Sequence, residues 1–528
     1  MTLAKSGSRC ISASQSASIS CSFSISPIAF SPLRAPGKCD RTLRRNVFVV
    51  VMRRSTSQLF KDLPRITFPS REGIDGTKAI RERDEVEVIL AFVVSKARRA
   101  LGRPAAAGII LILIVVAVGG YYFVTLPPSA TQSTTSTTSS TTSTSVSGPS
   151  TIKVGMTMAL SGSLAADGVM SLNGLKLWAH NVNASGGIYV ASLGRKLPVQ
   201  LVYYDDTSTT SVVATDYQQL VTQGVNFLVA PYSSGLTLAA APIAEQNHLL
   251  LLSHGGASDS IWAKGYKYVV GVLSPGSQYM LPVIDMLKNL NSSTPLKVAF
   301  FYGNDAFSIS VINGASAYVN STSSFNVVYK QSYDESATSY TAQLAQIAAL
   351  NPDVLLGGAH FVDGETIMKN IQSLGLHFKM AAILVAPDDP RFLSDLGSLA
   401  GYVVAPSQWE SSLDFSSFTP YFGNITSTQF FTQFNSTYKM PPNYEAAEAY
   451  NTGLVLQKGI IDSGSLNSTI VRNQLSSESF YTFYGKFQLG RTGIQSGHTM
   501  VVMQWQSGAK KVVWPKPVAT SALVYPSP

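Results

Sequence analysis

One complete strand, loop, helix, turn and strand unit at residues 152–206 constrains the fold of this chain most strongly. The apolar run 152–160 predicts a buried strand, and residues 197–204 predict a second one. Between them, residues 169–184 carry leucines at helical spacing and end just before a Gly-Gly pair, as helices often do. A strand, a helix and a strand in this order indicate a crossover in a parallel α/β sheet.

The loop of this unit is the first candidate for a site. Residues 161–168 are small or hydroxyl-bearing, include glycine, and follow the carboxyl end of the first strand. In open α/β sheets ligands bind beyond the carboxyl ends of the strands. We therefore expect this loop to line a pocket for a small polar molecule.

The same alternation continues through residues 151–528. Further strands are predicted at residues 227–229, 248–252, 296–302, 354–356, 382–385 and 401–404, with helical segments between them. These 378 residues exceed what one hydrophobic core usually supports. The sequence therefore predicts an α/β protein with parallel sheets and two lobes.

Charge and cysteine usage exclude several classes. Of the 39 Lys and Arg residues, 19 lie in residues 1–104 against 8 acids, which leaves 20 basic and 22 acidic residues beyond. A basic surface for nucleic acid on the folded part is not supported. The cysteines Cys10, Cys21 and Cys39 all precede residue 40, so the larger part of the chain has neither disulfides nor a thiolate metal site. We expect no metal and no cofactor.

The segment 105–126 is apolar and predicts a transmembrane helix, which at 1.5 Å per residue spans the roughly 30 Å of a hydrocarbon core. Its basic flank at 96–103 predicts a cytoplasmic N-terminus and an extracellular C-terminal part. Residues 127–150 hold 17 Ser or Thr and predict an unfolded linker. Sequons, which permit glycosylation, occur at Asn183, Asn291, Asn320, Asn424, Asn435 and Asn467.

Residues 1–104 form a basic segment with two interpretations. The Ser-rich, acid-free start resembles an organelle transit peptide. Alternatively, translation begins later, for example at Met52, and the favoured interpretation is that the upstream stretch is not made.

The order of short motifs in residues 151–520 resembles the branched-chain amino-acid-binding protein family, the solute receptors of ABC importers with the type I periplasmic-binding fold. The resemblance rests on the following motifs: Leu160-Ser-Gly, Asn183-Ala-Ser-Gly-Gly-Ile, Tyr204-Asp-Asp, Ala230-Pro-Tyr-Ser-Ser-Gly, Asn351-Pro-Asp-Val-Leu-Leu-Gly-Gly and Leu374-Gly-Leu. It implies two Rossmann-like lobes that close on a solute in the cleft. By this analogy lobe 1 takes residues 151–272 and 405–500, and lobe 2 takes 273–404 and 501–528.

The resemblance also implies site residues in lobe 1. Ser233 and Ser234 precede a helix, and Ser234 matches a serine that touches the ligand's carboxylate in the family. The next such loop contains Gly255, Ala257 and Ser258. Relatives usually carry threonine where Ala257 stands, and Ser258 offers a replacement hydroxyl.

In lobe 2, Asp388 matches an acidic residue that pairs with the solute's ammonium group in the family. His360 stands near a common aromatic position, and Phe307 falls where tyrosine is common. In lobe 1, Asp167 replaces an apolar or aromatic residue. These departures indicate a solute other than plain leucine, such as another amino acid or an amide.

Catalysis finds no support, because nucleophile-elbow, P-loop and His-Glu-x-x-His motifs are missing and the six histidines are scattered. The expected function is membrane-anchored solute capture for an ABC importer, with permease subunits as partners. A ligand-sensing ectodomain with the same fold stays open as the alternative.

Overall fold

A computed structural model describes residues 148–290 and 292–528. The predicted N-terminal segment 1–104 and transmembrane helix 105–126 lie outside these residues, as does nearly all of the linker 127–150. Among the helices of the described ranges, none combines the length and apolar character that crossing a bilayer requires.

The first sheet has five parallel strands and forms the centre of lobe 1. In spatial order they are β4 (Val199–Asp205), β1 (Ile152–Met158), β5 (Phe227–Val229), β6 (Leu251–Ser253) and β7 (Val269–Gly271). The helices α3 (Ala165–Ala184), α4 (Thr210–Thr222) and α5 (Ser234–Gln246) connect the early strands. Strands with helices on both faces are buried, which explains why every residue of β1 except Lys153 is buried.

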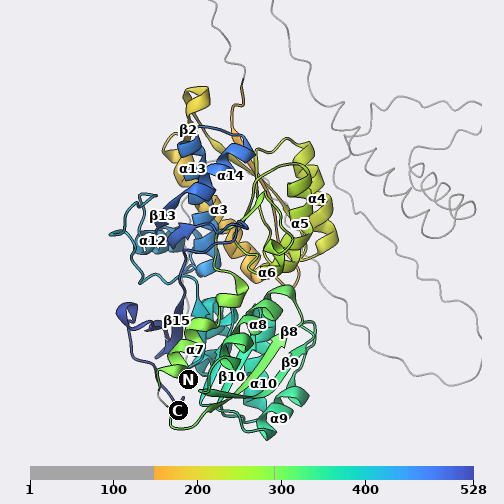
Figure 1. The fold of residues 1–528 in the computed structure, drawn as a ribbon, viewed down its shortest axis with the longest axis vertical. Helices are drawn as coiled ribbons and strands as arrows, with labels where there is room; N and C mark the ends of the chain where they lie inside the picture. The colour runs from red at the N-terminus through yellow and green to blue at the C-terminus, as the bar shows by residue number, and fades with distance from the viewer. Residues whose placement is uncertain (1–147, 291) are drawn as a thin grey trace, which may run out of the picture. The chain divides into compact units, whose positions relative to one another are not determined.

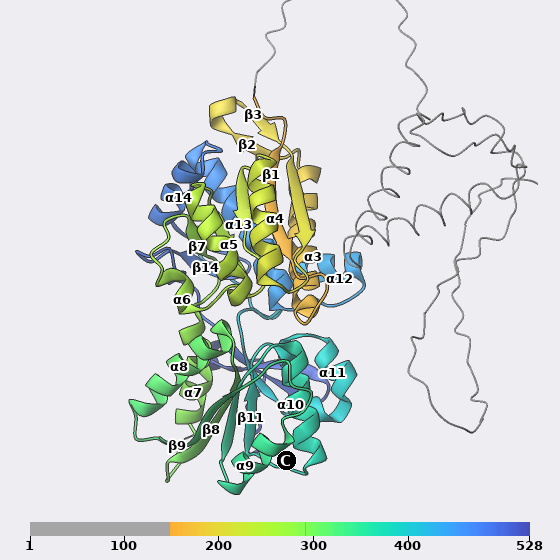
Figure 2. The ribbon, with the colours of Figure 1, turned by 90° about the vertical axis from the view of Figure 1, so that its right-hand side faces the viewer.

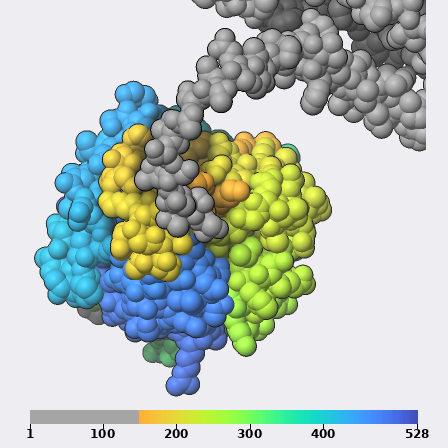
Figure 3. Space-filling model, turned by 90° about the horizontal axis from the view of Figure 1, so that it is seen from above, coloured from red at the N-terminus to blue at the C-terminus, as the bar shows by residue number. Residues whose placement is uncertain are grey.

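A second part of lobe 1 comes from much later in the chain. It consists of α12 (Ser427–Tyr438), α13 (Tyr444–Ser463), α14 (Ser468–Ser477) and the hairpin β13 (Ser479–Thr482) and β14 (Gly485–Gln488). Seen from above, the yellow early segment and the blue late segment lie side by side in lobe 1 (Figure 3).

Helices α3 and α13 are packed unusually closely. A Cβ atom on Gly174 of α3 would lie 2.1 Å from the carbonyl oxygen of Ala446 in α13. One on Gly453 of α13 would lie 2.1 Å from the ring of Trp178. Only glycine permits this approach, so these two positions fix how the helices sit against each other.

Lobe 2 is built on a seven-stranded mixed sheet. Its spatial order is β16 (Ala509–Trp514), β15 (Val501–Gln506), β12 (Val404–Ser407), β11 (Met380–Ile383), β10 (Val354–Gly358), β8 (Leu296–Gly303) and β9 (Phe325–Tyr333). The strands from β12 to β9 are parallel, whereas β15 pairs antiparallel with β12 and with β16. The helices of this lobe are α7 (Leu281–Lys288), α8 (Ala306–Asn320), α9 (Thr341–Ala349), α10 (Phe361–Ser373) and α11 (Arg391–Leu396).

The chain passes between the lobes after β7, after β12 and after β14 (Figures 1 and 2). The predicted α/β class with parallel sheets is confirmed. The antiparallel strands β15 and β16 were not expected from the sequence. The boundaries of the two-part lobes, at 272, 404 and 500, stay predictions.

Candidate functional site

The nine residues expected in the site come from strand-end loops and helix starts of both lobes. Eight of them are buried, and Gly255 is half-buried. Gly255 lies against the ring of Tyr232, 2.8 Å from where a Cβ atom would stand. The loops that carry these residues follow β1, β5, β6, β8, β10 and β11. Strand ends from both lobes therefore converge on one buried space.

Ser234 organises the loops of lobe 1. Its Oγ accepts hydrogen bonds from the backbone N–H of Ala257 and of Ser258, both at 3.0 Å. Ser233 is the residue before α5, and the Ser258 hydroxyl pairs with that of Ser260 at 2.9 Å. Because the Ser234 hydroxyl accepts twice, its own hydrogen stays available for a further acceptor. The N–H groups of Ala257 and Ser258 are already used by the protein.

His360 connects the two lobes. It stands at the start of α10, and its Nδ1 lies 3.1 Å from the hydroxyl oxygen of Tyr232 in lobe 1. Its Nε2 lies 3.6 Å from Oδ1 of Asp305, and its ring packs against Phe307 with 5.5 Å between centroids. Burial alone would lower the pKa of His360, but chiefly Asp305 raises it to about 10. The imidazole is therefore held as a cation.

Asp167 lies in the first turn of α3 and is 1% exposed. Its Oδ1 has no hydrogen-bond partner. Burial, together with the charge of Asp389, raises the pKa of Asp167 to about 7, while His360 and Arg391 oppose that rise. A carboxyl group in this state is ready to accept a positive partner or to give up a proton near neutral pH.

Asp388 is the acid that lobe 2 contributes, and it is fully buried. Neither of its oxygens has a hydrogen-bond partner, and the closest cation is Lys510 Nζ, 3.8 Å from Oδ1. Lys510 lies nearer to Glu410, at 3.1 Å. Burial raises the pKa of Asp388 well above its ordinary value, and the neighbouring carboxyl group of Glu410 adds to this rise, while Lys510 and Ser407 offset part of it.

Two further acids in the same space were not foreseen. Glu445 and Glu448 of α13 are fully buried, and the charges of Asp167 and Asp388 contribute to a raised pKa of Glu445. Tyr484 donates a hydrogen bond of 3.0 Å to Glu448. The sequence did hold a signal, because acids three residues apart lie on one face of a helix. That face, however, resembles an ordinary solvated one.

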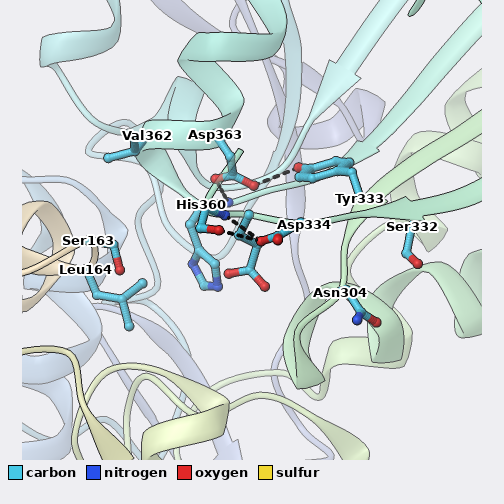
Figure 4. Close-up of a pocket in the computed structure, with 11 residues that line it drawn as sticks. Ser163, Leu164, Asn304, Ser332, Tyr333, Asp334, His360, Val362 and Asp363 are labelled. Atoms are coloured by element: carbon cyan, nitrogen blue, oxygen red, sulfur yellow. Dashed lines mark hydrogen bonds between the residues drawn. The ribbon is translucent and has the colours of Figure 1, made fainter. Parts of the chain in front are cut away.

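A pocket of ≈ 610 Å³ lies at the edge of this space, mainly over lobe 2 (Figure 4). It is lined by Ser163 and Leu164 from lobe 1 and by Asn304, Ser332, Tyr333, Asp334, Glu335, Ser336, His360, Val362 and Asp363 from lobe 2. Tyr333 donates to Asp363, which in turn accepts from the backbone N–H of His360. The close-up shows these three residues joined in one network.

One set of side chains in the described ranges has the composition of a metal site. Ligand atoms of Asp305, Glu335 and His360 all lie within 4.8 Å of one another. Two members of this set, His360 and Asp305, already form an ion pair in the fold. The loop at residues 161–168, which was expected to bind solute, is held by a hydrogen bond within lobe 1. The hydroxyl of Ser161 donates to the carboxylate of Asp205 at 2.7 Å.

Comparison with known proteins gives one family. Residues 151–510 match the family model described as periplasmic binding protein. A protein of Brucella melitensis, called Leu/Ile/Val-binding protein homolog 7, is 22% identical over 392 residues, which is 71% of this chain and 94% of that protein.

Solved structures agree on the fold. The branched-chain amino acid transporter substrate binding protein LivJ of Streptococcus pneumoniae, in complex with isoleucine, has a TM-score of 0.59 at 20% identity, covering 71% of this chain and 100% of that one. A solute-binding protein of Rhodopseudomonas palustris in complex with benzoate also gives 0.59, at 19% identity, covering 71% and 98%. Likeness at this level concerns the fold alone.

Proposed function

The chain belongs to the periplasmic binding protein family, and from this premise we propose that it captures a small solute between its lobes for an ABC importer. It is a solute-binding protein and not an enzyme. The proposed role is to present the closed, loaded form to permease subunits. Ligand binding shifts such a protein toward closure only by as much as the closed state binds it better.

The contact between Tyr232 and His360 carries this proposal. The two side chains belong to different lobes, lie 3.1 Å apart and are buried. Burial raises the pKa of Glu445, and the charges of Asp167 in lobe 1 and of Asp388 in lobe 2 both add to this rise. A buried polar space assembled from both lobes is complete only when the lobes are together, which supports capture by hinge closure.

The proposed solute is an amino acid, which presents an ammonium group, or an amide, which presents N–H donors. Asp388 supports this nitrogen group, because a fully buried carboxyl group without a hydrogen bond needs a donor. Ser234 supports an acceptor group on the solute, since its hydroxyl hydrogen is free to donate to an oxygen. The relatives that bind isoleucine and benzoate indicate that this fold accommodates more than one solute class.

Location at the extracellular face of the membrane is a further part of the proposal. Its support is the apolar segment 105–126 with the basic flank before it. Glycosylation at the sequons belongs to the same proposal. The names of the two similar solved structures describe transporter proteins, which favours solute delivery over the sensory alternative.

Titration calorimetry of the purified full chain tests the proposal. The panel contains branched amino acids, other amino acids, amides and urea, and one class is expected to bind at about micromolar Kd or better. Small-angle scattering with and without that solute should show a more compact particle on binding. A chain that binds no member of the panel, or binds one without compaction, would contradict capture by closure.

A further inference from the structure

The space between the lobes contains more acid than one ammonium group needs. Four carboxyl side chains there are at most 1% exposed: Asp167, Asp388, Glu445 and Glu448. Each has at least one oxygen without a hydrogen-bond partner, and both oxygens of Asp388 and of Glu445 lack one. Buried polar groups are ordinarily satisfied, so four such acids in one place point to a missing partner.

Three of these acids come from two helices that are held together tightly. Asp167 lies in the first turn of α3 and Glu445 in the first turn of α13, with Glu448 on the same face one turn later. The glycine contact of Gly174 with Ala446 fixes α3 against α13. This acid trio is therefore a rigid feature of lobe 1, and Asp388 faces it from lobe 2.

The cationic side chains near this space, among the described residues, pair most closely with acids other than these four. Arg391 binds Asp389 at 2.5 Å, His360 is paired with Asp305, and Lys510 is closest to Glu410. Of the four acids, only Asp388 has a nearby lysine, at 3.8 Å.

His254 does not neutralise the trio either. Its Nδ1 lies 3.8 Å from Glu448, but neither ring nitrogen has a hydrogen-bond partner. Burial lowers the pKa of His254 to about 3, so the imidazole is neutral. In the region that the structure describes, Asp167, Glu445 and Glu448 have no cationic partner within salt-bridge distance, the neutral His254 aside.

Helix dipoles do not explain the cluster. The start of a helix favours a carboxylate in its first turn, which would help Asp167 and Glu445. That effect falls off within the turn and supplies no hydrogen bond to the orphaned oxygens. Burying several like charges together costs more than a dipole returns, so burial raises the pKa of Asp388, Glu445 and Glu448, and these acids hold protons until a cation lets them ionise.

Aromatic rings complete the surroundings. Burial raises the pKa of Tyr232, Tyr279 and Tyr444, and the charge of Glu445 adds to the rise of each pKa. The faces of such rings attract organic cations. Among the described residues, only Asp305, Glu335 and His360 bring three ligand atoms within 4.8 Å of one another. The four acids are therefore spaced too widely to surround one metal ion, and together with the tyrosine rings they suit an ammonium or guanidinium group better.

We infer that the solute is an organic dication, with one charged nitrogen group at Asp388 and a second at the acid trio of Asp167, Glu445 and Glu448. The inference rests on the proposed function and narrows its solute class. A diamine or an amino acid with a basic side chain satisfies both positions. An amino acid with an apolar side chain leaves the trio without a partner.

Titration calorimetry of the full chain with five probes tests the inference. The probes are 1,4-diaminobutane, arginine, isoleucine, butylamine and calcium chloride. We expect 1,4-diaminobutane or arginine to bind at least about 10-fold more tightly than isoleucine and butylamine, since one further charge-assisted hydrogen bond contributes that much. Which of the two binds better tells a diamine from a basic amino acid.

Two variants locate the second charge. Glu445→Gln should weaken the dication at least about 10-fold and leave butylamine unchanged. The control is Glu365→Gln, a buried acid of α10 that pairs with Lys369 and should change neither. Thermal unfolding of each variant shows that the fold is retained.

The outcomes separate this inference from the proposed function. Preference for isoleucine over both dications would overturn the inference and leave solute capture standing. Binding of calcium without either dication would also overturn it. Failure of all five probes to bind would overturn the inference, and the wider panel of amino acids, amides and urea would then decide the proposed function. An unchanged dication affinity in Glu445→Gln would remove the trio from the site.

Discussion

The hydroxyl oxygen of Tyr232 lies 3.1 Å from Nδ1 of His360, and this contact joins the loop after β5 in lobe 1 to the start of α10 in lobe 2. Both side chains are buried, and their rings meet edge to face. A single polar contact of this kind reports directly on whether the lobes are together.

Removing the Tyr232 hydroxyl should weaken closure. A hydrogen bond contributes roughly 0.5–1.5 kcal/mol, so we expect the solute affinity of Tyr232→Phe to fall by about 2- to 10-fold in titration calorimetry. The matched control is Tyr340→Phe, whose hydroxyl donates to the Asp334 carbonyl within lobe 2. Equal losses in both variants would show that the Tyr232 contact has no special role in closure.

Replacing Asp388 with Asn should discriminate amine-bearing solutes. The change keeps the buried volume but removes a group that can ionise beside an ammonium group. We expect affinity for such solutes to fall by about 10- to 100-fold, since hydrogen bonds to charged groups contribute roughly 1.5–3 kcal/mol. Asp395→Asn, at an exposed position of α11, is the control and should bind as the parent chain does. Unchanged affinity in Asp388→Asn would exclude this carboxylate from the site.

The glycine contact between α3 and α13 should be intolerant of any side chain. A Cβ atom at Gly174 would lie 2.1 Å from the Ala446 carbonyl oxygen, so Gly174→Ala forces the helices apart. We expect a loss of about 1–3 kcal/mol in unfolding free energy, typical of overpacked positions, together with weaker solute binding. Urea unfolding measures the first quantity.

Gly235 supplies the control for this prediction. It lies in α5, and nothing stands within 4 Å of an added Cβ. Gly235→Ala should therefore keep or slightly raise stability, since Ala is the better helix former. Gly174→Ala with parental stability would mean that the two helices yield at little cost.

Stability should depend on pH through Asp167. Burial raises its pKa from 3.8 to about 7, so between these values the folded chain holds a proton that the unfolded chain has released. Stability therefore falls as pH rises through this window, by up to about 1.4 kcal/mol per pH unit for this group. Asp167→Asn, which does not titrate, should show a shallower fall in urea unfolding.

The fall should be reduced rather than abolished in Asp167→Asn. Burial also raises the pKa of Asp206 to about 6 and that of Glu335 to about 7, and both act with the same sign. Asp334→Asn is the control, because hydrogen bonds from Ser336 lower the pKa of this exposed acid. Identical slopes for the parent and Asp167→Asn would show that Asp167 ionises normally in the fold.

Membrane topology is testable on intact cells. Protease added from outside should release the solute-binding part by cutting within residues 127–150, because the Ser/Thr-rich composition there cannot bury enough apolar surface to fold. A cytoplasmic marker protein must survive the same treatment. Protection of the solute-binding part until the cells are permeabilised would reverse the proposed orientation.

The sequence predicted the strands whose residues are apolar on both faces, such as β1 and β8. It did not predict β9, whose residues Asn326, Lys330 and Gln331 face solvent, because a strand with exposed polar residues resembles a loop. The antiparallel strands β15 and β16 escaped for a related reason. They add antiparallel strands to the edge of the sheet whose parallel strands the sequence predicted. Pairing between segments that are distant in the chain leaves no signal in the local sequence.

The candidate site divides in the same way. Asp388 and Ser234 came from resemblance, because neither lies in a pattern that marks a site by itself. Glu445 and Glu448 have the spacing of a solvated helix face, and only the packing of α13 against α3 reveals that they are buried. Helical periodicity predicts which residues share a face of a helix. It does not predict whether tertiary packing buries a polar face.

Lobe 1 is built from an early and a late segment of the chain, and this order determines when its parts can pack together during synthesis. Helix α3 emerges from the ribosome early, but its partner α13 is made only after five of the seven strands of the lobe 2 sheet have been synthesised. At a synthesis rate of roughly 5–20 residues per second, the apolar face of α3 stays exposed for about 10 to 60 seconds before α13 can pack against it. During that interval the nascent chain exposes an apolar surface that can aggregate. Binding by a chaperone or prompt export would protect the chain most at that stage.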